Sequence, residues 1–155
     1  MKESMREMEE TNMIIYGVCI SDIKSYNEEK AEKFLESLRN TNISDIADDY
    51  FINKEEYGYD LNEYLYGFES QSGHYGIAAF LKEIIENIEG IDISCDDPDG
   101  VHYLGLSADA PWKFNDKTKN MSEEEYNAIL TRYVSYFTDD VLEIRWWNVN
   151  DDCDW

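Results

Sequence analysis

The sequence predicts an α/β (α+β) fold: a four-stranded antiparallel or mixed sheet of βαββαβ-like order, with helices packed on one face and a helical insertion in the first crossover. Three observations predict this fold. A β-hairpin pattern occupies residues 91–106, near the middle of the chain. Two segments with the same helical apolar spacing flank the hairpin, and a strand-like segment lies toward each end of the chain.

The hairpin is predicted from the alternation of its residues and from its turn. Ile91, Ile93 and Cys95 alternate with polar residues, which is the pattern of a half-buried strand. The second strand is expected at residues 101–106, after the turn Asp96-Asp97-Pro98-Asp99-Gly100. Because proline presets φ for a turn and glycine tolerates positive φ, this composition favours a tight connection.

The two flanking helices are predicted by apolar residues at offsets 0, 3, 4, 7, 8 and 11. The first helix is expected over residues 74–89 and the second over residues 123–137. Since this spacing gives one continuous apolar face, both helices are expected to pack on the same face of the sheet. A strand that is apolar on both faces, as a central strand would be, is expected at residues 13–21, and the last strand is expected at residues 141–149. A further helix is expected to begin after Asn27, a helix-capping residue type.

Residues 43–69 have the pattern that is hardest to interpret. Tyrosines and acids are mixed there, and two glycines interrupt any period. We expect an irregular, acidic, aromatic-rich insertion with short helices. Residues 1–155 as a whole are expected to form a single domain, with a flexible tail at 1–12 and an acidic tail at 150–155.

The cysteines and the first residues indicate the compartment. Cys19, Cys95 and Cys153 are widely separated and odd in number, which favours thiols in a reducing environment. Residues 1–12 are charged and lack the apolar core of a secretory signal, and no apolar run approaches the length of a membrane span. We therefore expect a cytoplasmic protein.

Charge is the most unusual property of the chain. Its 155 residues include 35 acidic and 13 basic side chains, a net charge of −22, yet 14% of the residues are aromatic. Disordered acidic chains are poor in aromatic residues, so we expect a folded domain with a strongly negative surface. Such a surface repels nucleic acids and anionic membranes and attracts basic proteins, so neither nucleic acid nor membrane is expected to be a direct partner.

The negative charge is concentrated in three segments. Residues 45–69 carry a net charge of −7, residues 82–99 carry −6 and residues 139–154 carry −5. If these segments share one side of the fold, they form an acidic face comparable to the phosphate backbone of a duplex. Aromatic residues in two of them would supply the desolvated anchors of an interface. The residues predicted to contact a partner are Tyr57, Tyr59, Asp60, Glu63, Tyr64, Asp96, Asp97, Asp99, Asp151, Asp152, Asp154 and Trp155.

Signatures of catalysis, cofactor binding and metal binding are weak. The sequence has no phosphate-binding loop, no Gly-x-Ser-x-Gly motif and no Cys-x-x-Cys spacing. His102 and Cys95 could form a nucleophile site across the hairpin, but a strand thiol and an unrelated imidazole are the simpler interpretation. The aspartates of residues 92–99 could bind a divalent cation, although an ordinary surface turn has the same composition. We therefore expect no enzyme, no cofactor and no metal.

In its size, acidity and aromatic content, and in the general character of segments such as His102–Asn115, the chain resembles the anti-CRISPR and antirestriction inhibitors of phages and mobile elements. No motif matches residue by residue, so no site residue is carried over. The resemblance implies an inhibitor that acts as a DNA or RNA mimic in the basic groove of a nuclease, with a CRISPR-Cas effector as the first candidate. Two alternatives stay open: an immunity protein that neutralises a basic toxin nuclease, and a small cytosolic hydrolase with an unrecognised site.

Overall fold

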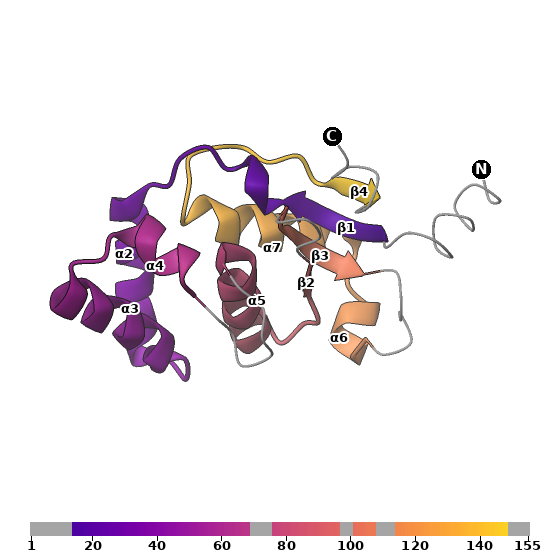
Figure 1. The fold of residues 1–155 in the computed structure, drawn as a ribbon. Helices are drawn as coiled ribbons and strands as arrows, with labels where there is room; N and C mark the ends of the chain where they lie inside the picture. The colour runs from indigo at the N-terminus through magenta and orange to yellow at the C-terminus, as the bar shows by residue number, and fades with distance from the viewer. Residues whose placement is uncertain (1–13, 69–75, 97–100, 108–113, 149–155) are drawn as a thin grey trace.

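A computed structural model of the chain describes residues 14–68, 76–96, 101–107 and 114–148. It shows a mixed α+β fold in which four strands form one open antiparallel sheet (Figure 1). The elements, in chain order, are β1 (Ile14–Cys19), α2 (Glu28–Ser37), α3 (Ser44–Tyr57), α4 (Leu61–Tyr66), α5 (Gly76–Glu89), β2 (Ser94–Asp96), β3 (Tyr103–Ser107), α6 (Asp116–Lys119), α7 (Glu123–Ser135) and β4 (Arg145–Asn148). Short 3₁₀ turns follow β1 and α2, at Ile20–Asp22 and Leu38–Asn40.

The sheet has the strand order β2-β3-β1-β4, so the first strand of the chain is an inner strand. β2 pairs with β3 as the hairpin pattern predicts, with Cys95 opposite Leu104. Within the described residues, each strand lies within or close to its predicted range and spans fewer residues. Ile91 and Ile93 are buried although they precede β2, which begins at Ser94. The alternating apolar pattern therefore predicted which side chains are buried, but not where strand pairing begins.

Helices α5 and α7 pack on one face of the sheet, where the main core lies (Figure 1). Tyr16 and Val18 of β1 meet this core from the sheet, and Ile84 of α5 and Leu130 of α7 meet it from the helices. The apolar residues of α5 that have the predicted helical spacing, which we call the α5 stripe, are all buried except Ile88, which lies in the last turn. The period of the apolar residues therefore predicted the faces of both helices.

The other face of the sheet carries a smaller cluster around Trp147. The indole N–H of Trp147 donates to the carbonyl oxygen of Gly17 at 2.8 Å. Gly17 lies opposite Gly105, and a Cβ atom added to Gly17 would lie 2.1 Å from the carbonyl oxygen of Leu104. Only glycine permits this close approach of β1 and β3.

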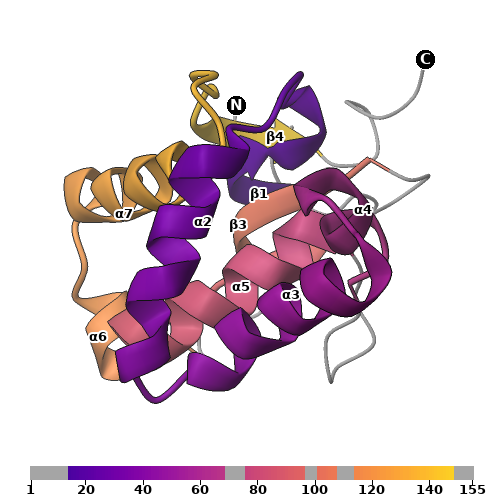
Figure 2. The ribbon, with the colours of Figure 1, turned by 90° about the vertical axis from the view of Figure 1, so that its left-hand side faces the viewer.

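Helices α2, α3 and α4 lie together at one end of the molecule (Figures 1 and 2). α2 begins where its cap predicts: the side chain of Asn27 accepts the backbone N–H of Lys30 at 3.1 Å. Helices are present in residues 43–69 as expected, but α3 is longer and more regular than the expected short helices, with 14 residues. Its buried Ala47 and Tyr50 anchor it to the core.

The core contains tyrosines whose burial raises their pKa well above the ordinary value. The four tyrosines with the largest increase in pKa are Tyr50, Tyr64, Tyr126 and Tyr133. Three of them donate a hydroxyl hydrogen bond to a carboxylate, which raises the pKa further. Among the helices in the described ranges, none combines the length and apolar content needed to cross a bilayer.

Candidate functional site

Five of the twelve residues predicted to contact a partner lie together where α3 meets α4. They are Tyr57, Tyr59, Asp60, Glu63 and Tyr64. Asp96 is the last residue of β2, and its side chain is not described. Six predicted contacts lie outside the described residues: Asp97, Asp99, Asp151, Asp152, Asp154 and Trp155.

The junction between the two helices is built by local signals in the sequence. α3 ends at Gly58, which has the left-handed φ of +70° that favours glycine, and its N–H donates to the carbonyl of Lys54. Asp60 then caps α4: its carboxylate accepts the N–H of Glu63 at 2.8 Å, and the Glu63 carboxylate accepts the N–H of Asp60 at 3.3 Å. This reciprocal capping box holds both acids in place at the helix start.

Exposed tyrosines lie before and after the capping acids in the chain. Tyr57 is 66% exposed and Tyr59 is 40% exposed, and their ring centroids lie 5.6 Å apart. Tyr66, in the last turn of α4, is 90% exposed. It is absent from the sequence prediction, although the helical spacing could have identified it: Leu61, Tyr64 and Leu65 take the buried face and leave Tyr66 outside.

Tyr64 lies in the core, unlike the other tyrosines of the junction. It is only 6% exposed, and its ring packs against Tyr50 and Phe80 with ring centroids 5.2 and 5.8 Å apart. Its hydroxyl donates to the carboxylate of Asp49 at 2.6 Å. The ring of Tyr64 therefore stabilises the fold rather than serving as an exposed contact.

Most of the acids at the junction have no ion-pair partner among the described residues. Lys54, the lysine of this segment, is engaged by Glu28 and Glu32 of α2. Glu55, Glu56, Asp60 and Glu63 make no ion pair within the described ranges. We call these four acids with Tyr57, Tyr59 and Tyr66 the acidic aromatic surface.

The other acidic segments are more fully neutralised. In residues 82–96, Glu86 pairs with Lys82 and Glu89 pairs with Arg132. In residues 139–148, Asp139 pairs with Lys30 at 3.0 Å and Glu143 pairs with Arg145 at 3.5 Å. The uncompensated charge of the described residues is thus greatest on α3 and α4.

The described acids of the three segments lie on different elements. Glu55, Glu56, Asp60 and Glu63 lie on or beside α3 and α4, at one end of the molecule (Figure 1), whereas Asp139 and Asp140 lie beside residues 24–30, at the start of α2. Five of the acids predicted to build a duplex-like face lie outside the described residues, so that face stays a prediction: Asp97, Asp99, Asp151, Asp152 and Asp154.

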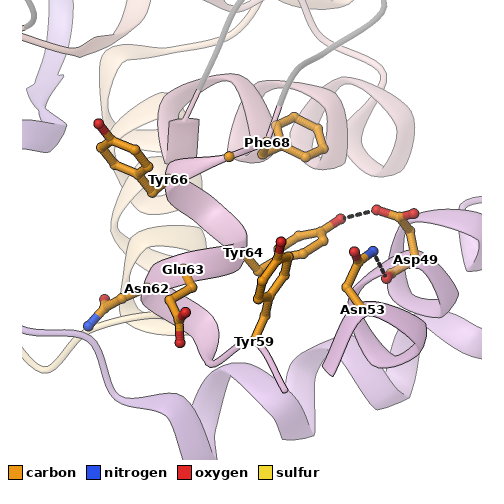
Figure 3. Close-up of a pocket in the computed structure, with 9 residues that line it drawn as sticks. Asp49, Asn53, Tyr59, Asn62, Glu63, Tyr64, Tyr66 and Phe68 are labelled. Carbon is orange, nitrogen blue, oxygen red and sulfur yellow. Dashed lines mark hydrogen bonds between the residues drawn. The ribbon is translucent and has the colours of Figure 1, made fainter. Parts of the chain in front are cut away.

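A hollow of about 850 Å³ lies between α3 and α4, beside the acidic aromatic surface (Figure 3). Its walls combine aromatic rings with oxygen-bearing side chains from both helices. The lining residues are Asp49, Asn53, Tyr59, Asn62, Glu63, Tyr64, Tyr66, Gly67 and Phe68. A second hollow, of about 650 Å³, shares Asn62 and Tyr66 with the first and reaches His102.

The described residues do not support the alternatives of a nucleophile site or a metal site. Cys95 is buried opposite Leu104 in the hairpin, whereas His102 lines the second hollow beside Gly76. The Asp92 carboxylate accepts the backbone N–H of Asn115 at 2.6 Å. Across residues 14–68, 76–96, 101–107 and 114–148, no group of three or more His, Cys, Asp or Glu residues is arranged to hold a metal ion.

No family model matches the chain, and no curated protein or solved structure is significantly similar to it. The chemistry open to the acidic aromatic surface follows from its own groups, which are carboxylates without counterions and exposed tyrosine rings. Carboxylates form charge-assisted hydrogen bonds with lysine and arginine, and tyrosine rings accept cations on their faces. The surface is thus complementary to a basic protein surface.

Proposed function

We propose that the protein is an inhibitor that binds the basic nucleic-acid groove of a nuclease, and that the acidic aromatic surface makes this contact. A CRISPR-Cas effector of the host is the first target to test, and carriage by a phage or mobile element belongs to the same proposal. One observation carries it: four carboxylates without ion pairs gather beside three exposed tyrosines at one end of the fold.

The physical basis is competition for the cations that hold nucleic acid. Lysine and arginine side chains that neutralise phosphates form charge-assisted hydrogen bonds with carboxylates equally well. A net charge of −22 also accelerates association with a basic groove, and salt screens this attraction. The exposed rings of Tyr57 and Tyr66 supply desolvated contact area that charge alone does not provide.

The test is binding of the purified chain to a panel of CRISPR nucleases, each with and without its guide RNA. We expect affinity for at least one of them to fall as salt rises and to fall again when target DNA or guide RNA is added. Cleavage of target DNA should be inhibited over the same range of protein concentration. Affinity that is indifferent to both salt and nucleic acid would rule out occupation of the groove.

Two charge variants locate the contact. Glu55→Gln combined with Glu56→Gln removes two unpaired charges from the acidic aromatic surface. Asp116→Asn combined with Glu124→Gln removes the same charge from the first turns of α6 and α7, away from α3 and α4. We expect the first pair to weaken binding at least tenfold, about 1.4 kcal/mol, and the control pair to change it far less.

An immunity protein that neutralises a toxin nuclease is the second candidate, and one observation favours it. The four acids of the acidic aromatic surface lie within two neighbouring helices at one end of the fold, which is a short contact compared with a face of duplex length. A contact of that extent suits the active-site cleft of a small basic nuclease. The same assay with toxin nucleases separates the two candidates by which class of enzyme is inhibited.

The finer description of the fold belongs to the same proposal. We infer that α3 and α4 are an insertion in the first crossover of a βαββαβ plan and that this insertion carries the contact surface. Their position between α2 and α5 in the chain, at the end of the molecule away from β4, supports this inference. A cytoplasmic location, where nucleases act on intracellular nucleic acid, is likewise proposed.

A further inference from the structure

We propose that the hollow between α3 and α4 binds the guanidinium group of an arginine from the partner. This inference rests on the proposed function, because it names the chemical group in the basic groove that the inhibitor captures. It depends on three properties of the hollow: which hydrogen-bonding atoms remain available in it, which charges line it, and which ring faces border it.

Two polar side chains that line the hollow present acceptor atoms to it. The Tyr64 hydroxyl proton is committed to Asp49, so the Tyr64 oxygen presents lone pairs. The Asn53 side chain donates to the backbone carbonyl of Asp49 at 2.7 Å. Only the amide nitrogen can donate to a carbonyl, so Asn53 presents its Oδ1 atom as an acceptor.

The charges that line the hollow are all negative. The exposed carboxylates of Asp49 and Glu63 lie in its wall, and one Asp49 oxygen accepts the Tyr64 hydroxyl. Neither lysine nor arginine is among the described residues that line it. A bound cation therefore meets no competing positive charge.

Tyrosine rings border these acceptors. Tyr59 and Tyr64 both line the hollow, and Figure 3 shows Asp49 and Asn53 on α3 across from them. Tyr59 is 40% exposed, so part of its ring is open to a ligand. A planar cation can stack on such a ring while it donates hydrogen bonds to oxygen atoms at the ring edge.

Guanidinium meets these requirements better than ammonium. Arginine has five N–H donors in a rigid plane and no acceptor, which complements a wall of carboxylate, amide and phenol oxygens. It is also more weakly hydrated than the lysine ammonium group and stacks on aromatic faces. The hollow should therefore discriminate between the two cations, whereas an exposed acidic patch would not.

The test uses three blocked tripeptides as probes: Gly-Arg-Gly, Gly-Lys-Gly and a version with citrulline, the neutral analogue of arginine. Each is titrated into the ¹⁵N-labelled full-length chain and followed by NMR. We expect the arginine peptide to shift the Asn53 side-chain amide and the backbone amides around Tyr59. The lysine peptide should bind several-fold more weakly, and the citrulline peptide should cause no saturable shift.

Two isosteric variants of α3 provide the matched control. Asp49→Asn removes the charge from the hollow, while its amide oxygen can still accept the Tyr64 hydroxyl. Asp45→Asn removes one exposed charge a single turn away on the same helix, outside the hollow. We expect Asp49→Asn to weaken the arginine peptide about tenfold and Asp45→Asn to leave its affinity within about twofold. Unchanged melting temperatures show that each variant is folded.

The outcomes separate this inference from the proposed function. Equal affinity for arginine and lysine, saturable binding of citrulline, or equal effects of the two variants would overturn the guanidinium site, even if the chain inhibits a nuclease. Arginine-selective binding that depends on Asp49, in a chain that inhibits none of the nucleases, would retain the site and overturn the proposed function.

Discussion

The hydroxyl of Tyr126 provides a sensitive test of the structure. Tyr126 is 2% exposed, and its hydroxyl has no hydrogen-bond partner among the described residues. Burial of a hydroxyl without a partner costs about 1–3 kcal/mol. Tyr126→Phe keeps the ring and removes that cost, so we expect the free energy of unfolding to rise by about 1 kcal/mol. For a chain of this length, the melting temperature should rise by about 2–4 °C.

Tyr133→Phe is the matched control, because Tyr133 lies two turns later on the same buried face of α7. Its hydroxyl donates to the Glu89 carboxylate at 2.6 Å, and the substitution removes this charge-assisted hydrogen bond, while Arg132 still donates to the same carboxylate. We expect this variant to lose about 1–2 kcal/mol. Urea denaturation followed by circular dichroism measures both changes, provided that the m-values agree. A loss of stability in Tyr126→Phe similar to that in Tyr133→Phe would show that its hydroxyl is bonded and that the reasoning is wrong.

Three further perturbations test the core and the titration of its tyrosines. Gly17→Ala places a Cβ atom 2.1 Å from the Leu104 carbonyl oxygen, so we expect a loss of several kcal/mol in urea denaturation; unchanged stability would show that β1 and β3 do not approach so closely. Ile84→Asp puts a charge at a fully buried position and is expected to abolish cooperative thermal unfolding; a melting temperature like that of the wild type would show that the α5 stripe is not core. Burial raises the pKa of Tyr50, Tyr64, Tyr126 and Tyr133, so above about pH 10 the unfolded chain releases protons that the folded chain keeps. Stability should then fall by about 1.4 kcal/mol per pH unit for each of them, and tyrosinate absorbance together with circular dichroism should show these four ionising only as the chain unfolds.

The elements that could be predicted are those whose own sequence carries a period or a cap. The stripes of α5 and α7 are long enough to define a face without knowledge of their neighbours. Asn27 starts α2 through a bond to a residue three positions later, so its signal is local. In contrast, Ala47 and Tyr50 are the only buried residues of α3. Two buried positions among many acids are too few to be recognised in the sequence as an apolar helix face.

The candidate site shows the same division between local and distant information. Tyr57, Tyr59, Asp60 and Glu63 could be grouped in advance because they are neighbours in the chain. The contribution of Asp49 could not, because it depends on how α4 packs back against α3. The ion pairs that neutralise the other acidic segments, such as Arg132 with Glu89, likewise join separate elements. They therefore cannot be predicted from the composition of either segment.

The inner position of β1 also imposes an order on folding during translation. Cys19 pairs with Tyr103, 84 residues later in the chain, and Ile14 pairs with Asn148, 134 residues later. At about 5–20 residues per second, the ribosome needs roughly 4–17 s to reach the first of these partners. α2 to α5 are synthesised within that interval and can form local turns. During the same interval, β1 has apolar side chains and a backbone without strand partners. The nascent chain is therefore most exposed to misassociation before its hairpin is complete, and the sheet closes only when β4 has been made.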